Sequence, residues 1–199
     1  MEKIGLRPNQ IERFERLALP YLPVVLRTAR YLTRHDSEAE DLAQDAMIKV
    51  MRAIDTFKDG TNMKAWLMTI IRRTHIDRVR AGKRRRRDVS LDQAVAVAAA
   101  DDQPGTFDEQ WVESGVEPDK IMNRFEDQTL IDALKTLPEA IRWTLLLTDV
   151  EQLDQLTAAT IMEVPVGTVK SRVHRGRRML RDGLYRIAQE RGWIANDKR

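Results

Sequence analysis

The chain has 199 residues, a formal net charge of +3 and no cysteine. Without cysteine it has no disulfide framework, no thiol nucleophile and no cysteine-ligated zinc site. It also lacks an apolar run long enough to cross a bilayer, and charged residues interrupt the N-terminal stretch where a signal peptide needs apolar side chains. We therefore expect a cytoplasmic protein with no membrane insertion.

The modest net charge conceals a strong segregation of charge along the sequence. Residues 72–87 contain nine Arg or Lys and one Asp, whereas residues 88–127 contain eleven Asp or Glu and two basic residues. A second basic run, residues 166–181, contains six Arg or Lys and no acid. Surface helices usually mix both signs, so a run this one-sided indicates a polyanionic partner or a strongly acidic neighbour.

The N-terminal part of the chain is predicted to be helical. Apolar periodicity indicates two short helices at 11–19 and 21–32. The run from Ser37 to Glu40 has the capping-box form and predicts the start of a third helix. The apolar stripe of that helix repeats at the helical period and consists of Ala39, Leu42, Ala43, Ala46, Met47, Val50, Met51 and Ile54.

A polar loop and a basic helix follow that stripe. The loop covers 55–62 and contains Gly60. The helix is predicted from residue 63 to about residue 80, and Gly82 with the basic run after it is expected to mark its end.

The remaining sequence divides into a linker and a second helical unit. Residues 88–118 combine many acids with Pro104 and Gly105 and show no sustained amphipathic period, which is typical of a linker. Helices are then predicted at 119–137, 139–150, 154–162 and 166–188. The last two, joined by a short turn with the second one cationic, form a helix-turn-helix.

No strand alternation and no internal repeat is visible. The prediction is therefore an all-α fold made of two small helical domains, residues 8–87 and 119–190. An acidic flexible linker, residues 88–118, joins them, and the C-terminal domain contains the helix-turn-helix.

Three segments, in this order, resemble the extracytoplasmic-function (ECF) group of bacterial RNA polymerase sigma factors. The segment 39–45, AEDLAQD, is similar to the family's core-polymerase-binding helix. The segment 65–78, AWLMTIIRRTHIDR, is similar to its promoter-melting helix. Segments 137–142 and 164–172 together are similar to the domain that reads the upstream promoter element. The resemblance implies a non-enzymatic factor that brings core polymerase to promoter DNA.

The basic helix of the C-terminal domain is the expected reader of the minus-thirty-five element. Free amides at its N-terminus, at Gly167 and Thr168, can hold a phosphate, and Arg or Lys can read guanine edges in the major groove. The alternative is an amphipathic helix whose cations are merely solvated. The candidate residues are Thr168, Lys170, Ser171, Arg172, His174, Arg175 and Arg178.

The loop and helix around residue 66 are the expected minus-ten site. By resemblance, the loop captures an extruded base while the basic helix holds the melted strand, which needs a pocket and a basic track. An aromatic at helical spacing is more often core, and this alternative applies to Trp66. Arg73 stands where the family commonly has Asn, so no base preference is carried over there. The candidate residues are Asn62, Lys64, Trp66, Arg72, Arg73, Arg78 and Arg80.

The acidic segment near residue 40 is the expected polymerase-binding site. By resemblance its residues, Glu40, Asp41, Gln44 and Asp45, dock on the coiled coil of the polymerase clamp, and the C-terminal domain meets the flap. A metal site is an alternative, but capping and the helix dipole alone explain acids clustered near a helix start. The linker acids either suit a positive polymerase channel or belong to an ordinary spacer.

The resemblance also bears on partners and on rival functions. It implies core RNA polymerase, promoter DNA and an anti-sigma protein as partners, and no cofactor or metal. One rival is a helix-turn-helix regulator that binds duplex DNA unaided. The other is a metal-dependent nucleic-acid-processing enzyme that uses the acids near Asp41.

The sequence departs from the family pattern at two places that affect packing. Glu163 occupies a turn that often has Gly, and the helix before it lacks the usual aromatic and acid.

Overall fold

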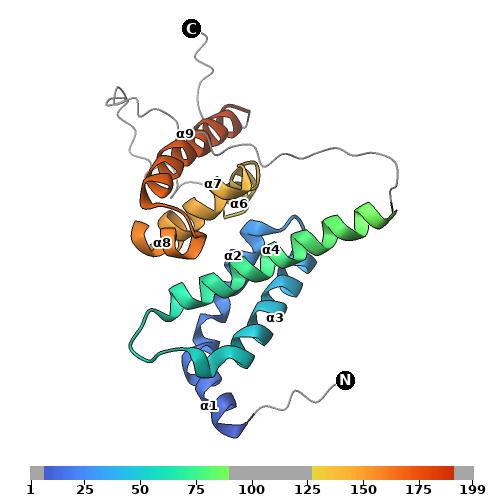
Figure 1. Cartoon of the computed structure of the whole chain (residues 1–199). Helices are drawn as coiled ribbons and strands as arrows, with labels where there is room; N and C mark the ends of the chain where they lie inside the picture. The colour runs from blue at the N-terminus through green and yellow to red at the C-terminus, as the bar shows by residue number, and fades with distance from the viewer. Residues whose placement is uncertain (1–6, 90–126, 191–199) are drawn as a thin grey trace. The chain divides into compact units, whose positions relative to one another are not determined.

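The computed structural model describes residues 7–89 and 127–190 (Figure 1). The chain divides near residue 104 into two compact units, each with its own buried apolar side chains. All regular elements in the described ranges are helical, which confirms the predicted all-α class. The predicted linker lies outside the described residues except for positions 88 and 89, which belong to the preceding helix.

The first unit begins with two short helices, as predicted. Helix α1 (Pro8–Leu17) is followed by a 3-10 turn, η1 (Leu19–Tyr21), and by α2 (Leu22–Leu32). Pro20 and Pro23 both occupy the first or second position of their element. Proline is tolerated there because the first amides of a helix have no partner within it.

Helix α3 (Asp36–Ala53) starts earlier than the sequence indicated. His35 is the N-cap residue and makes no side-chain cap bond, so the predicted capping box at Ser37 is wrong. The backbone amide of Arg34 instead donates to Glu38 Oε2 at 3.3 Å. Asp36 and Glu38 place negative charge in the first turn, where the helix dipole favours it. The predicted stripe is buried at every position except Met51, which is half-buried.

Helix α4 (Met63–Val89) follows a 3-10 turn, η2 (Ile54–Thr56), and a loop in which Gly60 has a φ of +82°. The predicted end of the helix near Gly82 is wrong, since α4 continues for two further turns. Gly82 does not adopt the left-handed conformation that ends helices. The Arg and Lys residues around it favour helix, and one internal glycine costs only about 1 kcal/mol.

The core of the first unit forms where α3 packs against both α2 and α4. In Figure 1 these three helices lie side by side. A cluster at the lower end of the unit joins the end of α1 to the loop before α4. Its buried members are Ala18, Val50, Ile54, Phe57, Met63 and Leu67.

The second unit begins with α6 (Asp127–Lys135), and its predicted part at 119–126 lies outside the described residues. Helix α7 (Glu139–Leu145) has Pro138 as its N-cap. It runs on into a π-helical turn, η3 (Leu146–Val150), within the helix predicted over 139–150.

Helices α8 (Gln155–Met162) and α9 (Val166–Glu190) pack against each other around a short turn, which confirms the helix-turn-helix. Glu163 occupies the turn with a φ of +58° and a ψ of 43°. Glycine adopts this left-handed conformation without strain, whereas other residues adopt it at a cost of about 1 to 2 kcal/mol. The turn therefore keeps the usual geometry with an unusual residue.

Candidate nucleic-acid interface

Helix α9 has a buried face and a cationic outer face. Val169, Val173, Gly176 and Leu180 are buried at intervals of three and four residues, so they form one continuous stripe. The opposite face has the same spacing, and the expected readers that lie on it are Ser171, His174, Arg175 and Arg178. The remaining three, Thr168, Lys170 and Arg172, border this outer face, and only Lys170 among them is fully exposed.

The N-terminus of α9 differs in one detail from the prediction. The amide of Thr168 donates to the carbonyl of Pro165 at 3.0 Å, so it is not available to a phosphate. The hydroxyl of Ser171 donates to the carbonyl of Thr168 at 3.0 Å, which orients that side chain along the helix. Arg172 and Arg175 also interact within the protein.

The expected minus-ten residues occupy two sides of α4. Asn62, Trp66, Arg73 and Arg80 follow intervals of four and seven residues, so they share the side away from the buried stripe. Arg72 lies beside this row, whereas Lys64 and Arg78 project on the side of the buried stripe, at opposite ends of the predicted site. The structure therefore brings four of the seven residues into one row.

Two members of this row already have structural roles. The side-chain oxygen of Asn62 accepts a hydrogen bond of 3.0 Å from the amide of Ala65, which caps α4. The ring of Trp66 is half-buried against the core cluster, and its centroid lies 5.3 Å from that of Phe57 at an interplanar angle of 55°. This is a favourable aromatic geometry, so the expected core role of Trp66 is realised.

The loop before α4 is fastened to α1, a feature that sequence reasoning missed. Arg13 Nη2 donates to the carbonyl of Phe57 at 2.6 Å and forms an ion pair with Asp59. Arg7 pairs with Asp55 at 2.5 Å. The partners lie more than forty residues apart in sequence, and no local pattern marks such a pair. The part-buried bond from Arg13 to the main chain therefore links the loop that leads to Asn62 to α1, and the exposed Arg7 pair adds a weaker contact.

The expected polymerase-binding residues lie on two neighbouring faces of α3. Arg78 Nη2 on α4 lies 3.6 Å from Asp41 Oδ2, and its Nη1 lies 3.5 Å from Asp45 Oδ2. Glu40 and Gln44 instead line a groove between α3 and the first two helices. All four side chains are exposed.

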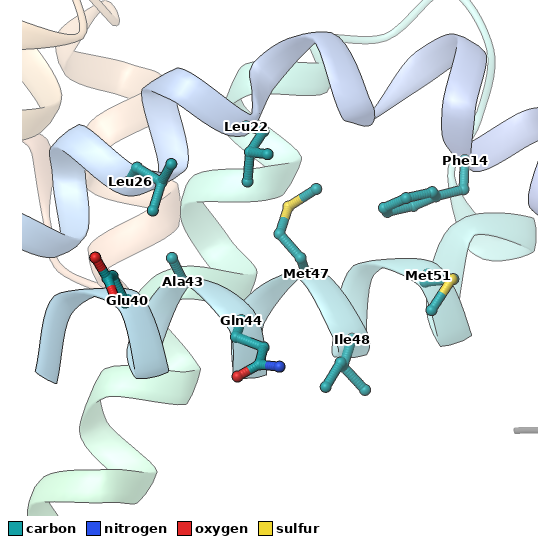
Figure 2. Close-up of a pocket in the computed structure, with 9 residues that line it drawn as sticks. All are labelled: Phe14, Leu22, Leu26, Glu40, Ala43, Gln44, Met47, Ile48 and Met51. Atoms are coloured by element: carbon teal, nitrogen blue, oxygen red, sulfur yellow. The ribbon is translucent and has the colours of Figure 1, made fainter. Parts of the chain in front are cut away.

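The groove beside Glu40 is apolar and about 340 Å³ in volume. Figure 2 shows side chains of α1 and α2 on one side and of α3 on the other, with Met47 extending toward Leu22. The sequence placed Met47 and Met51 in the core; Met47 is buried, Met51 is half-buried, and both border this groove. Its lining consists of Phe14, Leu22, Leu26, Glu40, Ala43, Gln44, Met47, Ile48 and Met51.

Within 7–89 and 127–190, no three or more His, Cys, Asp or Glu side chains are grouped so as to hold a metal ion. No helix in the same ranges is both long and apolar enough to cross a membrane.

Comparison with known proteins identifies both units. The family model of sigma-70 region 2 matches residues 17–85, and that of sigma-70 region 4 matches residues 127–180. The first match covers α2, α3 and most of α4, and it begins at the last residue of α1. The second begins with α6 and ends at Leu180 on α9. A region 2 followed by a region 4 defines a sigma factor.

Individual relatives agree with this class. The ECF RNA polymerase sigma factor SigW of Bacillus subtilis is 34% identical over 148 residues, which cover 74% of this chain and 75% of the relative. The RNA polymerase sigma-H factor of Pseudomonas aeruginosa is 32% identical over 178 residues, or 89% of each chain. The chain belongs to the ECF RNA polymerase sigma factors, and it is an alternative sigma factor that directs transcription initiation.

Solved structures show the same fold. The sigma factor RpoE of Bartonella quintana, in complex with the anti-sigma factor NepR, matches with a TM-score of 0.63 and 30% identity. That match covers 86% of this chain and 96% of the other. CnrH, in complex with the cytosolic domain of CnrY, matches with a TM-score of 0.55 and 19% identity, which shows likeness of fold alone.

Proposed function

We propose that this sigma factor reads the minus-thirty-five element with the outer face of α9. The observation that carries the proposal is the four-residue outer row of Ser171, His174, Arg175 and Arg178, opposite a fully buried stripe. A helix with this division can enter the major groove while its apolar face stays on its own domain. Arginine at these positions presents two donors in a plane, which suits the O6 and N7 atoms of guanine.

The minus-ten element is held by the outer row of α4 and the loop before it. Arg73 and Arg80 offer cations two turns apart along the helix, a spacing that follows a phosphate chain. Trp66 acts through packing, because its ring supports the loop next to Asn62. Lys64 and Arg72 flank this row and add positive charge at its edges.

Core polymerase binds on α3, at the groove and at the acids beside it. The groove is apolar along its length, and Glu40 and Gln44 lie among its lining residues. This arrangement fits an amphipathic helix that presents apolar side chains to the groove and a basic or polar residue to its border. The clamp coiled coil of the polymerase is the proposed occupant, and the flap contacts the C-terminal domain. The polymerase supplies the catalysis.

An anti-sigma protein is a further proposed partner. A solved structure with a similar fold is the sigma factor RpoE in complex with the anti-sigma factor NepR. An anti-sigma protein that covers the α3 groove prevents polymerase from docking there. Regulation is then a competition between two proteins for one apolar surface.

Reconstituted transcription tests the proposal. Core RNA polymerase and the chain are supplied separately and together with genomic DNA of the host cell, and the starts of the transcripts are mapped. We expect new start sites only with both proteins, each preceded by a shared pair of sequence elements. Specific binding of duplex DNA by the chain alone, with no new start sites, would instead identify a stand-alone regulator.

A matched pair of variants tests the role of α9. Arg175→Gln removes a cation from the outer row, whereas Arg186→Gln removes an exposed cation about 16 Å further along the same helix. We expect Arg175→Gln to reduce initiation at the mapped promoters and to relax one position of the upstream element. Equal effects of the two substitutions would reduce the role of α9 to unspecific attraction.

A further inference from the structure

Arg177 is a cation of the recognition helix that turns toward its own domain. Its Nε donates to Asp149 Oδ2 at 2.9 Å, and its Nη2 donates to Asp149 Oδ1 at 3.0 Å. Two parallel bonds between a guanidinium and a carboxylate fix orientation as well as distance. The pair joins α9 to the π-helical turn η3 across 28 positions in the sequence.

Asp149 is itself held in place. Its side chain is only 14% exposed, and Thr148 Oγ1 lies 2.8 Å from Asp149 Oδ1. The turn that carries it is π-helical, with the amide of Glu151 donating to the carbonyl of Leu146 at 2.8 Å. The extra residue of a π turn changes the direction in which its side chains point. Asp149 therefore offers Arg177 a fixed acceptor.

Gly176 explains why α9 needs such a contact. A Cβ atom at Gly176 would lie 2.6 Å from Ile141 Cγ2 and 3.0 Å from Leu145 Cδ1, so α7 and α9 approach closely at this turn. The buried stripe of α9 opposes rotation of the helix about its axis, but Gly176, at this close approach, adds no side chain to that resistance. The neighbouring bidentate pair adds to that resistance.

We propose that the Asp149–Arg177 pair positions the recognition helix for promoter reading, and that Arg177 makes no phosphate contact. The inference rests on the proposed function of α9. The outer side chains lie about 5 to 6 Å from the helix axis, so a rotation of about 20° displaces them by about 2 Å. Hydrogen bonds to base edges tolerate only a few tenths of an ångström, so selectivity depends on this rotation.

Salt dependence separates a positioning residue from a phosphate ligand. A promoter is first selected from DNA randomised across the upstream element, with the full chain bound to core polymerase. Binding of that complex to the selected promoter is then measured over a range of salt concentrations. Asp149→Asn and Arg177→Gln should each weaken binding about tenfold, as is typical for coupled contacts. Neither should change the slope of log affinity against log salt, because no phosphate contact is lost. The double variant should be no weaker than either single one.

Two further variants complete the design. Arg178→Gln removes an outer-row cation that is proposed to read a base edge, so it should weaken binding about 5- to 150-fold and relax one position of the upstream element. Asp149→Glu keeps a carboxylate and should recover most of the affinity lost in Asp149→Asn. If both single variants unfold, the double substitution Asp149→Arg with Arg177→Asp restores an ion pair, with the acidic and basic side chains exchanged between the two positions. Recovery of promoter selectivity in the reversal supports the proposal, and a folded but unselective reversal overturns it.

Opposite results have distinct meanings. If Arg177 contacts phosphate, Asp149→Asn removes a competitor and tightens binding, and Arg177→Gln lowers the salt slope; either result overturns the positioning role. If Arg178→Gln leaves both affinity and slope unchanged, α9 does not face DNA, and the proposed function of α9 fails together with this inference.

Discussion

Nη1 of Arg78 on α4 lies 3.5 Å from Oδ2 of Asp45 on α3. Asp41 lies 3.6 Å from the same guanidinium, so one residue expected at the minus-ten DNA is paired with two expected at the polymerase. All three side chains are more than a third exposed. Exposed ion pairs contribute only about 0 to 1 kcal/mol to stability, so this contact does not hold the two helices together.

The first prediction concerns these acids. The double substitution Asp41→Asn and Asp45→Asn should change the free energy of unfolding by less than about 1 kcal/mol. It should weaken binding to core polymerase, measured by titration of a labelled chain. Lys49→Gln is the matched control, because it breaks another α3–α4 ion pair, to Asp77 at 3.0 Å, without touching the proposed docking residues. Equal loss of affinity in the control would remove the acids from the docking surface.

The second prediction concerns Trp66. Trp66→Phe should keep the contact with Phe57 and leave both stability and promoter melting near wild type. Trp66→Ala should cost up to about 3 kcal/mol, at the low end for a large aromatic because the ring is only half-buried. Urea unfolding measures the stability, and permanganate reactivity of promoter thymines measures melting. Loss of melting in a stable Trp66→Phe protein would show that the indole itself contacts DNA.

The third prediction compares two glycines of α9. Gly176→Ala should destabilise the second unit by about 1 to 3 kcal/mol, because the new methyl group collides with Ile141. Gly183→Ala meets no atom within 4 Å and should stabilise it by about 0.5 to 1 kcal/mol through the less flexible unfolded chain. Thermal unfolding followed by circular dichroism measures both. Similar shifts in the two variants would contradict the close approach of α7 and α9.

The fourth prediction concerns pH and the start of α8. Hydrogen bonds from the Thr157 side chain and then from its amide hold the pKa of Asp154 below its usual range. The unfolded chain therefore binds the proton more readily than the folded one. Stability from this cap is present above the ordinary Asp pKa of about 4 and is lost as pH falls through the lower folded value.

Asp154→Asn tests this cap, because asparagine also caps helices but does not titrate. The wild type should lose more thermal stability than the variant when the pH is lowered from about 5 into the acid range below the ordinary Asp pKa. Parallel melting curves over that range would contradict a cap contribution from the carboxylate.

The sequence by itself determined the helices, the helix-turn-helix and the family. These follow from local periodicity, turn residues and motif spacing, all of which act over a few neighbouring residues. The sequence misplaced the start of α3 and the end of α4, because both depend on small differences in local energy. The start of α3 lies before Ser37, because His35 is its N-cap and Asp36 and Glu38 already belong to its first turn. Helix α4 continued because the helix-favouring basic residues outweigh Gly82.

Tertiary structure alone decided which charged side chains pair within the protein and which face solvent. It assigned Arg177 to Asp149, Arg78 to Asp41 and Asp45, and part of the predicted α3 stripe to an open groove. A side chain's partner across two helices depends on how those helices pack, and residues about thirty or more positions apart leave no local pattern of that packing. The sequence therefore named the basic residues, and the fold determined which of them face outward.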